Sequence, residues 1–141
     1  MAAIVLGADS STLVLNGMII NDFAEGDTIT MSPVNARTSR THGNAGNVIV
    51  KERVDRNVYD ITIRVIQYSR SDVWLNDQMN GDIVLFNGSL KETFIKDGNV
   101  GSESWSIENG SITTQPSSTK NNQDGQPVME YTIQAVCERN V

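Results

Sequence analysis

The sequence is poor in the residues from which most catalytic and metal sites are built. Its 141 residues include one cysteine, Cys137, and one histidine, His42. A lone cysteine excludes an internal disulfide and suits a reducing compartment. One histidine leaves no histidine-based metal cluster and no spare partner for a Ser/His/Asp triad. We therefore predict a protein that is not an enzyme, with no catalytic residue, no cofactor and no bound metal.

Positive charge and long apolar runs are also scarce. The eleven Lys and Arg residues are scattered, and the formal net charge is −6. Binding of nucleic acid by phosphate neutralisation requires clustered basic residues, so it is not expected. No run approaches the roughly eighteen apolar residues of a membrane helix. The apolar start of the chain lacks a basic leader, which predicts a soluble protein made in a cytoplasm, with no membrane partner.

What the sequence does contain is a series of turn-forming dipeptides between short runs of Val, Ile, Thr and aromatic residues. Asn-Gly and Asp-Gly accept the positive φ angles of tight hairpin turns. Their regular spacing is typical of an antiparallel β-sandwich or barrel. The pairs are Asn16-Gly17, Asn80-Gly81, Asn87-Gly88, Asp97-Gly98, Asn109-Gly110 and Asp124-Gly125.

Two segments alternate apolar and polar residues with the period of a half-buried strand. In residues 57–68, Tyr59, Ile61, Ile63 and Val65 share one face, and in residues 129–137 every second residue from Met129 to Cys137 is apolar. Cys137 is therefore expected to be a buried small hydrophobe. Further strands are predicted at residues 12–15, 27–33, 47–54, 92–96, 104–107 and 111–115.

One helix and two long loops complete the prediction. Ser69 or Ser71 can cap a helix over residues 71–79, Asp72 suits its positive end, and Asn80-Gly81 stops it. Residues 34–46 and 116–127 are polar and lack periodicity, which predicts loops. His42 lies in the first and is expected to be solvated. The chain is thus predicted to be a single domain over residues 1–141, mainly β, with a small antiparallel barrel or sandwich and one flanking helix.

Three segments resemble the tail tube proteins of contractile-tailed bacteriophages. They are LVLNGMIINDFAEGDTIT (13–30), NVYDITIRVIQYSRSDVWLNDQMNG (57–81) and MEYTIQAVCE (129–138). The resemblance implies a fold related to the tube subunits of type VI secretion systems, with six copies closing into rings that stack into a hollow tube. It implies a virion protein assembled in the host bacterial cytoplasm, whose lumen passes DNA without binding it specifically.

The same resemblance implies partners and contact residues. The partners are further copies of the chain, the tail sheath protein, the tape measure protein, and the baseplate and tail terminator proteins. The loop over residues 34–46 corresponds to the family's loop that reaches the adjacent ring. Its candidate contact residues are Val34, Asn35, Arg37, Arg40, His42 and Asn44.

The polar faces of two predicted strands are candidates for the lumen or for a subunit contact, and the sequence does not decide between the two. They carry Thr28, Thr30 and Ser32 in one strand and Asp60, Thr62 and Arg64 in the other. An acidic chain suits a DNA conduit, because a basic lining would hold the duplex. Excess acid also serves solubility alone.

Two alternatives remain open at this stage. The chain can instead be a tube subunit of a phage-derived contractile injection or type VI-like secretion system. It can also be a carbohydrate-binding β-sandwich module, which would require Trp74 or Trp105 to be an exposed stacking platform.

Overall fold

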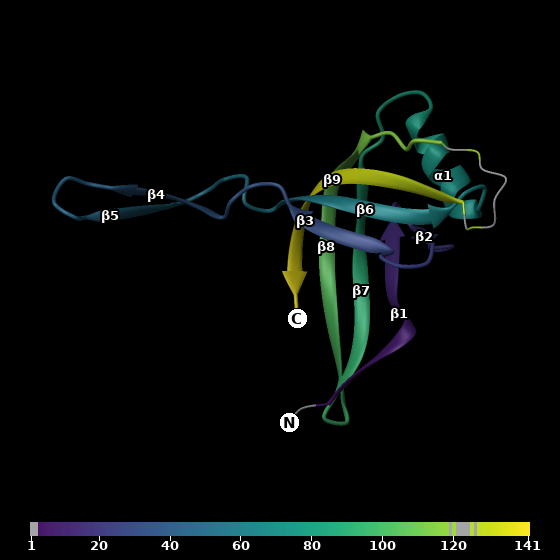
Figure 1. Cartoon of the computed structure of the whole chain (residues 1–141), viewed down its shortest axis with the longest axis horizontal. Coiled ribbons are helices and arrows are strands. Elements are labelled where there is room, and N and C mark those ends of the chain that lie inside the picture. The colour runs from purple at the N-terminus through teal and green to yellow at the C-terminus, as the bar shows by residue number, and fades with distance from the viewer. Residues whose placement is uncertain (1–2, 119, 121–124, 126) are drawn as a thin grey trace.

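The computed structural model describes residues 3–118, 120, 125 and 127–141, and its main body is one antiparallel sheet (Figure 1). The sheet has seven strands in the order β2-β1-β7-β8-β9-β6-β3, and β4 and β5 form a separate hairpin. The bounds are β1 Ile4–Leu15, β2 Met18–Ile20, β3 Ile29–Pro33, β4 Thr38–His42, β5 Val48–Glu52, β6 Val58–Ile66, α1 Arg70–Met79, β7 Phe86–Lys96, β8 Asn99–Thr114 and β9 Val128–Asn140.

The predicted fold class, mainly β with one flanking helix, is confirmed, and the sheet is rolled without being closed. β3 and β6 cross over the layer of β1, β7 and β8 (Figure 1). Within the described residues, the hydrogen-bonded order begins with β2 and ends with β3, so no ladder joins these two edges. The fold is therefore an open roll, and the prediction of a barrel is corrected in this respect. No helix of the described chain has the length and apolar character needed to span a membrane.

The core lies inside the roll and is filled by alternate residues of facing strands. Ile61, Ile63 and Val65 of β6 are fully buried, as the two-residue period predicts. On β9 the predicted apolar face is also confirmed, with Cys137 only 1% exposed. The remaining core residues are Leu13, Leu15, Ile20, Leu75, Phe86, Ile107, Tyr131, Ile133 and Ala135.

The helix begins where the sequence predicts, within one residue. The Ser69 side chain caps it by accepting a hydrogen bond from the Asp72 backbone N–H at 3.3 Å. Asp72 is itself buried: its Oδ2 accepts from the Tyr68 N–H at 2.8 Å, and its Oδ1 accepts from the Tyr131 hydroxyl at 2.6 Å. This carboxylate therefore joins the start of α1 to the middle of β9.

Two of the predicted turns are instead bends inside long strands. Asn16-Gly17 and Asp97-Gly98 do form turns with positive φ at both residues. Asn87-Gly88 lies within β7 and Asn109-Gly110 within β8, and the strand register shifts beside each pair. A β-bulge of this kind bends a strand and increases its twist, so these two pairs mark corners of the sheet. Of the pair Asp124-Gly125, Asp124 lies outside the described residues.

The predicted loop at 34–46 is also corrected. Residues 38–42 form β4, which pairs with β5 from Thr38↔Glu52 to His42↔Val48, so the segment is one arm of a hairpin. The sequence gave no strand signal because β4 is polar throughout, and a hairpin that packs on nothing needs no apolar face. In the other predicted loop, 116–127, the described residues belong to no helix or strand, and residues 119, 121–124 and 126 lie outside the described chain.

We expect Tyr131→Phe to lower the free energy of unfolding by about 1.5–3 kcal/mol, because a buried carboxylate loses a hydrogen-bond donor. Urea denaturation followed by tryptophan fluorescence, at concentrations too low for self-association, measures the change. The matched control is Tyr68→Phe, which removes a hydroxyl from a side chain that is 70% exposed. We expect this control to change stability by less than about 0.5 kcal/mol, and equal effects of the two variants would contradict the proposed role of Asp72.

Candidate assembly surfaces

The β4–β5 hairpin is the most exposed element of the protein. It projects from the body as a two-stranded ribbon (Figure 1), and all ten residues of its two strands are exposed. Val48, Ile49 and Val50 are 47%, 52% and 53% exposed although their side chains are apolar. A ribbon of this kind is only marginally stable by itself in water, and exposed apolar residues on it mark a contact surface.

The two faces of the hairpin differ in chemistry. Because paired residues of antiparallel strands point to the same side, the register places Arg40, His42, Val48 and Val50 on one face. Ser39, Thr41, Ile49 and Lys51 occupy the other. Residues 38–51 contain two cationic side chains and no carboxylate. In a chain of net charge −6, the hairpin is thus a basic extremity.

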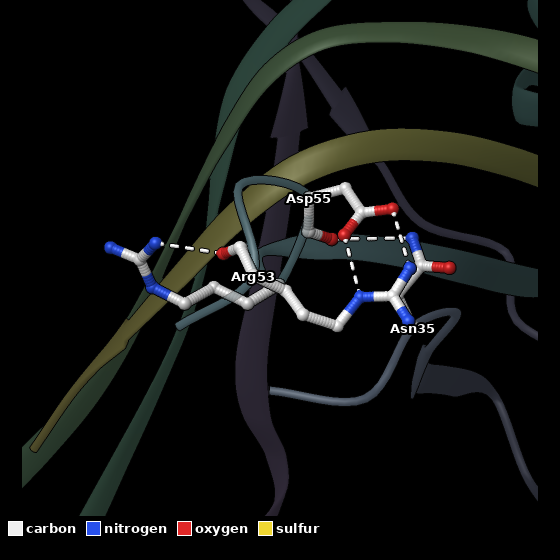
Figure 2. A network of polar contacts seen from close by, with 4 residues as sticks. Asn35, Arg53 and Asp55 are labelled. Atoms are coloured by element: carbon white, nitrogen blue, oxygen red, sulfur yellow. Dashed lines mark hydrogen bonds and ion pairs between the residues drawn. The ribbon is translucent and has the colours of Figure 1, made fainter. Parts of the chain in front are cut away.

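A polar network fixes the base of this hairpin (Figure 2). Arg53 donates to both carboxylate oxygens of Asp55, from Nε at 3.1 Å and from Nη2 at 3.2 Å. The Asn35 amide donates to the Asp55 carbonyl at 3.2 Å, and Arg56 Nη1 donates to the Arg53 carbonyl at 3.0 Å. The last contact of the base is backbone: the Arg53 N–H donates to the Arg37 carbonyl at 3.0 Å.

The Arg53–Asp55 pair makes the hairpin base sensitive to acid. The hydrogen bond from Arg53 lowers the pKa of Asp55 below its usual value, and the same bond raises the pKa of Arg53. A carboxyl whose folded pKa is depressed stabilises the fold above its unfolded pKa and loses that contribution as pH falls through the folded pKa. The base is therefore intact at neutral pH and weakens only below the ordinary carboxyl range, about pH 3.9.

The predicted contact residues divide between the base and the projecting part of the hairpin. Val34, Asn35 and Arg37 lie at the base, where the Val34 N–H donates to the Val58 carbonyl at 3.0 Å. Arg40 and His42 lie on β4, and Asn44 lies in the turn that joins β4 to β5. The sequence did not single out the apolar residues of β5 as part of this surface, although their run was already a predicted strand.

The structure brings all six residues of the predicted polar faces together on the outer side of the sheet. Thr30 pairs with Thr62, Ser32 pairs with Asp60, and the Arg64 N–H donates to the Thr28 carbonyl at 2.9 Å. The same face continues onto β9 and β8, because Thr62 pairs with Thr132 and Thr132 with Thr114. A row of threonines thus crosses four strands.

Charges on this outer face are largely compensated. Asp60 Oδ1 accepts from Gln134 Nε2 at 3.0 Å, and Arg64 Nε lies 4.0 Å from Glu130 Oε2. Glu130, Thr132 and Gln134 were not among the predicted face residues. Their alternation with Tyr131 and Ile133 was the available signal, but only the pairing of β6 with β9 shows that the two polar faces are continuous.

Open strand edges are a further potential contact surface. In the described chain β3 pairs only with β6, and β2 pairs only with β1. Unpaired N–H and C=O groups along such edges favour pairing with another chain. Apolar side chains are also exposed on the arm formed by the start of β1, where Ile4, Val5 and Leu6 are 63%, 57% and 56% exposed.

The two tryptophans are not open platforms. Trp74 packs on Phe86, with ring centroids 5.8 Å apart, and Trp105 meets Tyr59 edge to face at 5.1 Å. Both are only partly exposed. The requirement of the carbohydrate-binding hypothesis, an exposed aromatic ring, is therefore not met.

Comparison with solved structures places the fold. The sequence matches no protein-family model and no curated protein. The chain is similar to a chain of the sheath–tube complex of the PVC extracellular contractile injection system in its extended state, with a TM-score of 0.60 at 13% identity, covering 96% of this chain and 91% of that one. It is also similar to a chain of the PVC sheath/tube terminator (TM-score 0.64, 12% identity, 97% of each chain).

A third similar structure is the tube-terminating cap of the anti-feeding prophage, with a TM-score of 0.63 at 14% identity, covering 96% of this chain and 91% of that one. At these identities the likeness concerns the fold. It extends over nearly the whole chain and confirms the architecture that the resemblance to tail tube proteins implies.

We expect Asp55→Asn to loosen the hairpin base, because the neutral amide cannot form the two charge-assisted hydrogen bonds with Arg53. The measurement is hydrogen exchange of the Arg53 amide, which we expect to be several-fold faster in the variant, and to accelerate in the parent protein only below about pH 3.9. Glu108→Gln, a matched change at an exposed position on β8, should leave this amide unchanged. Unaltered exchange in Asp55→Asn would show that the base does not depend on the ion pair.

Proposed function

We propose that this chain is a non-catalytic structural protomer of the inner tube of a contractile tail, acting by assembling with copies of itself. The observation that carries the proposal is the combination of two open sheet edges with a projecting, exposed hairpin. Each of these features is costly or unstable in an isolated domain. Both become useful when an identical copy covers them, and the fold is one found in chains of contractile injection assemblies.

The sheet edges suit a ring. Pairing of the β3 edge of one copy with the β2 side of the next would continue the sheet around an axis and leave no free edge. Six copies per ring, as the resemblance to phage tail tubes implies, would then stack through the hairpin. Sheath, tape measure, baseplate and terminator proteins are the further partners of such a tube.

The outer face of β3, β6, β9 and β8 is the proposed lining of the lumen. Its central row is hydroxyl and uncharged, and its flanking charges are compensated by neighbours, as described above. A lining without clustered cations does not trap a polyanion, since counterion release drives DNA binding only where basic residues gather. In a phage tail this lumen would pass genomic DNA during ejection, and the protein would reside in the virion tail.

A tube subunit of a phage-derived injection system is the second candidate, and the comparisons favour it specifically. The similar chains come from an extracellular contractile injection system and from the anti-feeding prophage. The fold and the assembly surfaces would be the same in both cases, and the cargo of the lumen would differ. Neighbouring capsid and terminase genes would identify a phage, and their absence from the locus would identify the injection system.

The purified protein is expected to form rings or stacked tubes with an open channel. Negative-stain electron microscopy over a concentration series tests this directly, and two-dimensional averages give the number of copies per ring. Monomers at every concentration, together with no tubes in the native particle, would overturn the proposal.

The lumen assignment is tested by Thr62→Cys in assembled tubes, using the burial of Cys137 to keep the background low. A small charged methanethiosulfonate should label Cys at position 62 in tubes, whereas a bulky polyethylene glycol maleimide should label it only in dissociated subunits. Labelling by both reagents in tubes would place the face outside. Labelling by neither would place it in a subunit contact.

A further inference from the structure

Which surface receives the hairpin is a separate question, and the structure offers an acceptor at the opposite end of the same two strands. β3 leads into the hairpin at its C-terminal end, and β6 returns from it. At the other end of this ladder lie residues 19–28, with Phe23 bridged to Val65 and the Ala24 N–H bonded to the Arg64 carbonyl at 3.0 Å. Figure 1 shows the hairpin projecting away from this end of the ladder.

A groove of about 780 Å³ runs along residues 19–28, and we call it the acidic groove. Its apolar lining includes Ile19, which is 53% exposed, and Phe23. Asp22 and Glu25 also line it, Asp27 follows in the sequence, and residues 19–28 contain no Lys or Arg. The groove therefore combines apolar surface with negative charge.

The hairpin has the complementary combination. One face carries Val48 and Val50 beside Arg40, and residues 38–51 contain no carboxylate. Apolar residues of the ribbon can fill the groove while its cations meet the acids at the rim. Complementary charges of this kind set the orientation of a complex and disfavour wrong partners.

Both surfaces are held in shape before they meet. The hairpin base is fixed by Arg53 and Asp55, as described above. The groove is held by Arg64, whose Nη1 donates to the Glu25 carbonyl at 3.0 Å and to the Asp27 carbonyl at 3.2 Å. Surfaces that are already ordered lose less entropy on association.

From these features we propose that the hairpin face of Arg40, Val48 and Val50 docks in the acidic groove of a second copy of this chain. The contact is head to tail, because donor and acceptor lie at opposite ends of one ladder, and such a heterologous contact repeats along an axis without closing. This inference rests on the proposed tube, and it assigns the stacking contact between rings to two defined surfaces.

The docking is tested by cross-linking a chain that carries both Val50→Cys and Ile19→Cys. A disulfide forms only when the two Cα atoms approach within about 7 Å, so tubes of this variant should oxidise to a ladder of dimers, trimers and longer species on a non-reducing denaturing gel. The matched control is Ile49→Cys with Ile19→Cys. Ile49 is one residue away on the opposite hairpin face, and its ladder should form on the order of tenfold more slowly.

A second arm moves the acceptor to the smaller groove of about 230 Å³ at the C-terminal end of α1, by pairing Val50→Cys with Ile83→Cys. Tubes that form a ladder through position 83, through position 49, or not at all would overturn the docking inference and leave the tube proposal intact. Absence of tubes from the parent protein would remove both.

Charge reversal gives an independent check. Arg40→Glu or Asp27→Lys alone should raise the concentration needed for tube formation by about 5-fold, the upper range for one exposed ion pair, and the double variant should return it toward the parent value. Asp27 is used because Asp22 has a left-handed φ of 60°. Additive losses in the double variant would contradict docking of the hairpin at the acidic groove.

Discussion

The roll of the sheet depends on one corner, where β7 and β8 bend side by side. There the Asn109 N–H donates to the Asn87 side chain at 3.1 Å, and Phe86 pairs with Gly110. Glycine is required at this corner by close approach: a Cβ on Gly88 would overlap the Val14 carbonyl, and a Cβ on Gly110 would come within 3.0 Å of Ile133. The bend lets β6 and β9 face β1 and β7, and the core fills the space between them.

Rolling the sheet also determines which surfaces are left for assembly. Once the apolar faces of β6 and β9 point inward, their polar faces must point outward, and the threonine row becomes one continuous surface. Because the roll stops short of closure, β2 and β3 remain as edges. The helix does not cover either edge; it is joined to β9 through Asp72 and Tyr131. The features proposed to build a tube thus follow from the same bend that buries the core.

The hairpin is governed by different physics from the body. Nothing in the chain packs on its faces, so its order comes from the β4–β5 ladder and from the polar network at its base. Its residue types are accordingly free of the inside–outside alternation that marks the other strands. A partner surface is what would give its exposed valines a reason to be there.

Local pattern determined much of this protein. The inward faces of β6 and β9, the helix with its serine cap, and the turns at Asn16-Gly17 and Asp97-Gly98 all follow from residue period and turn chemistry, because each is stabilised by neighbours in sequence or by a single buried face. The tertiary structure decided the rest. Asn-Gly has the same backbone freedom in a turn and in a bulge, so only the surrounding strands show that Asn87-Gly88 and Asn109-Gly110 bend the sheet. Polar β4 carries no burial signal, and the meeting of Asp60 with Gln134, or of the hairpin end with the groove end of one ladder, is set by strand pairing across distant parts of the chain.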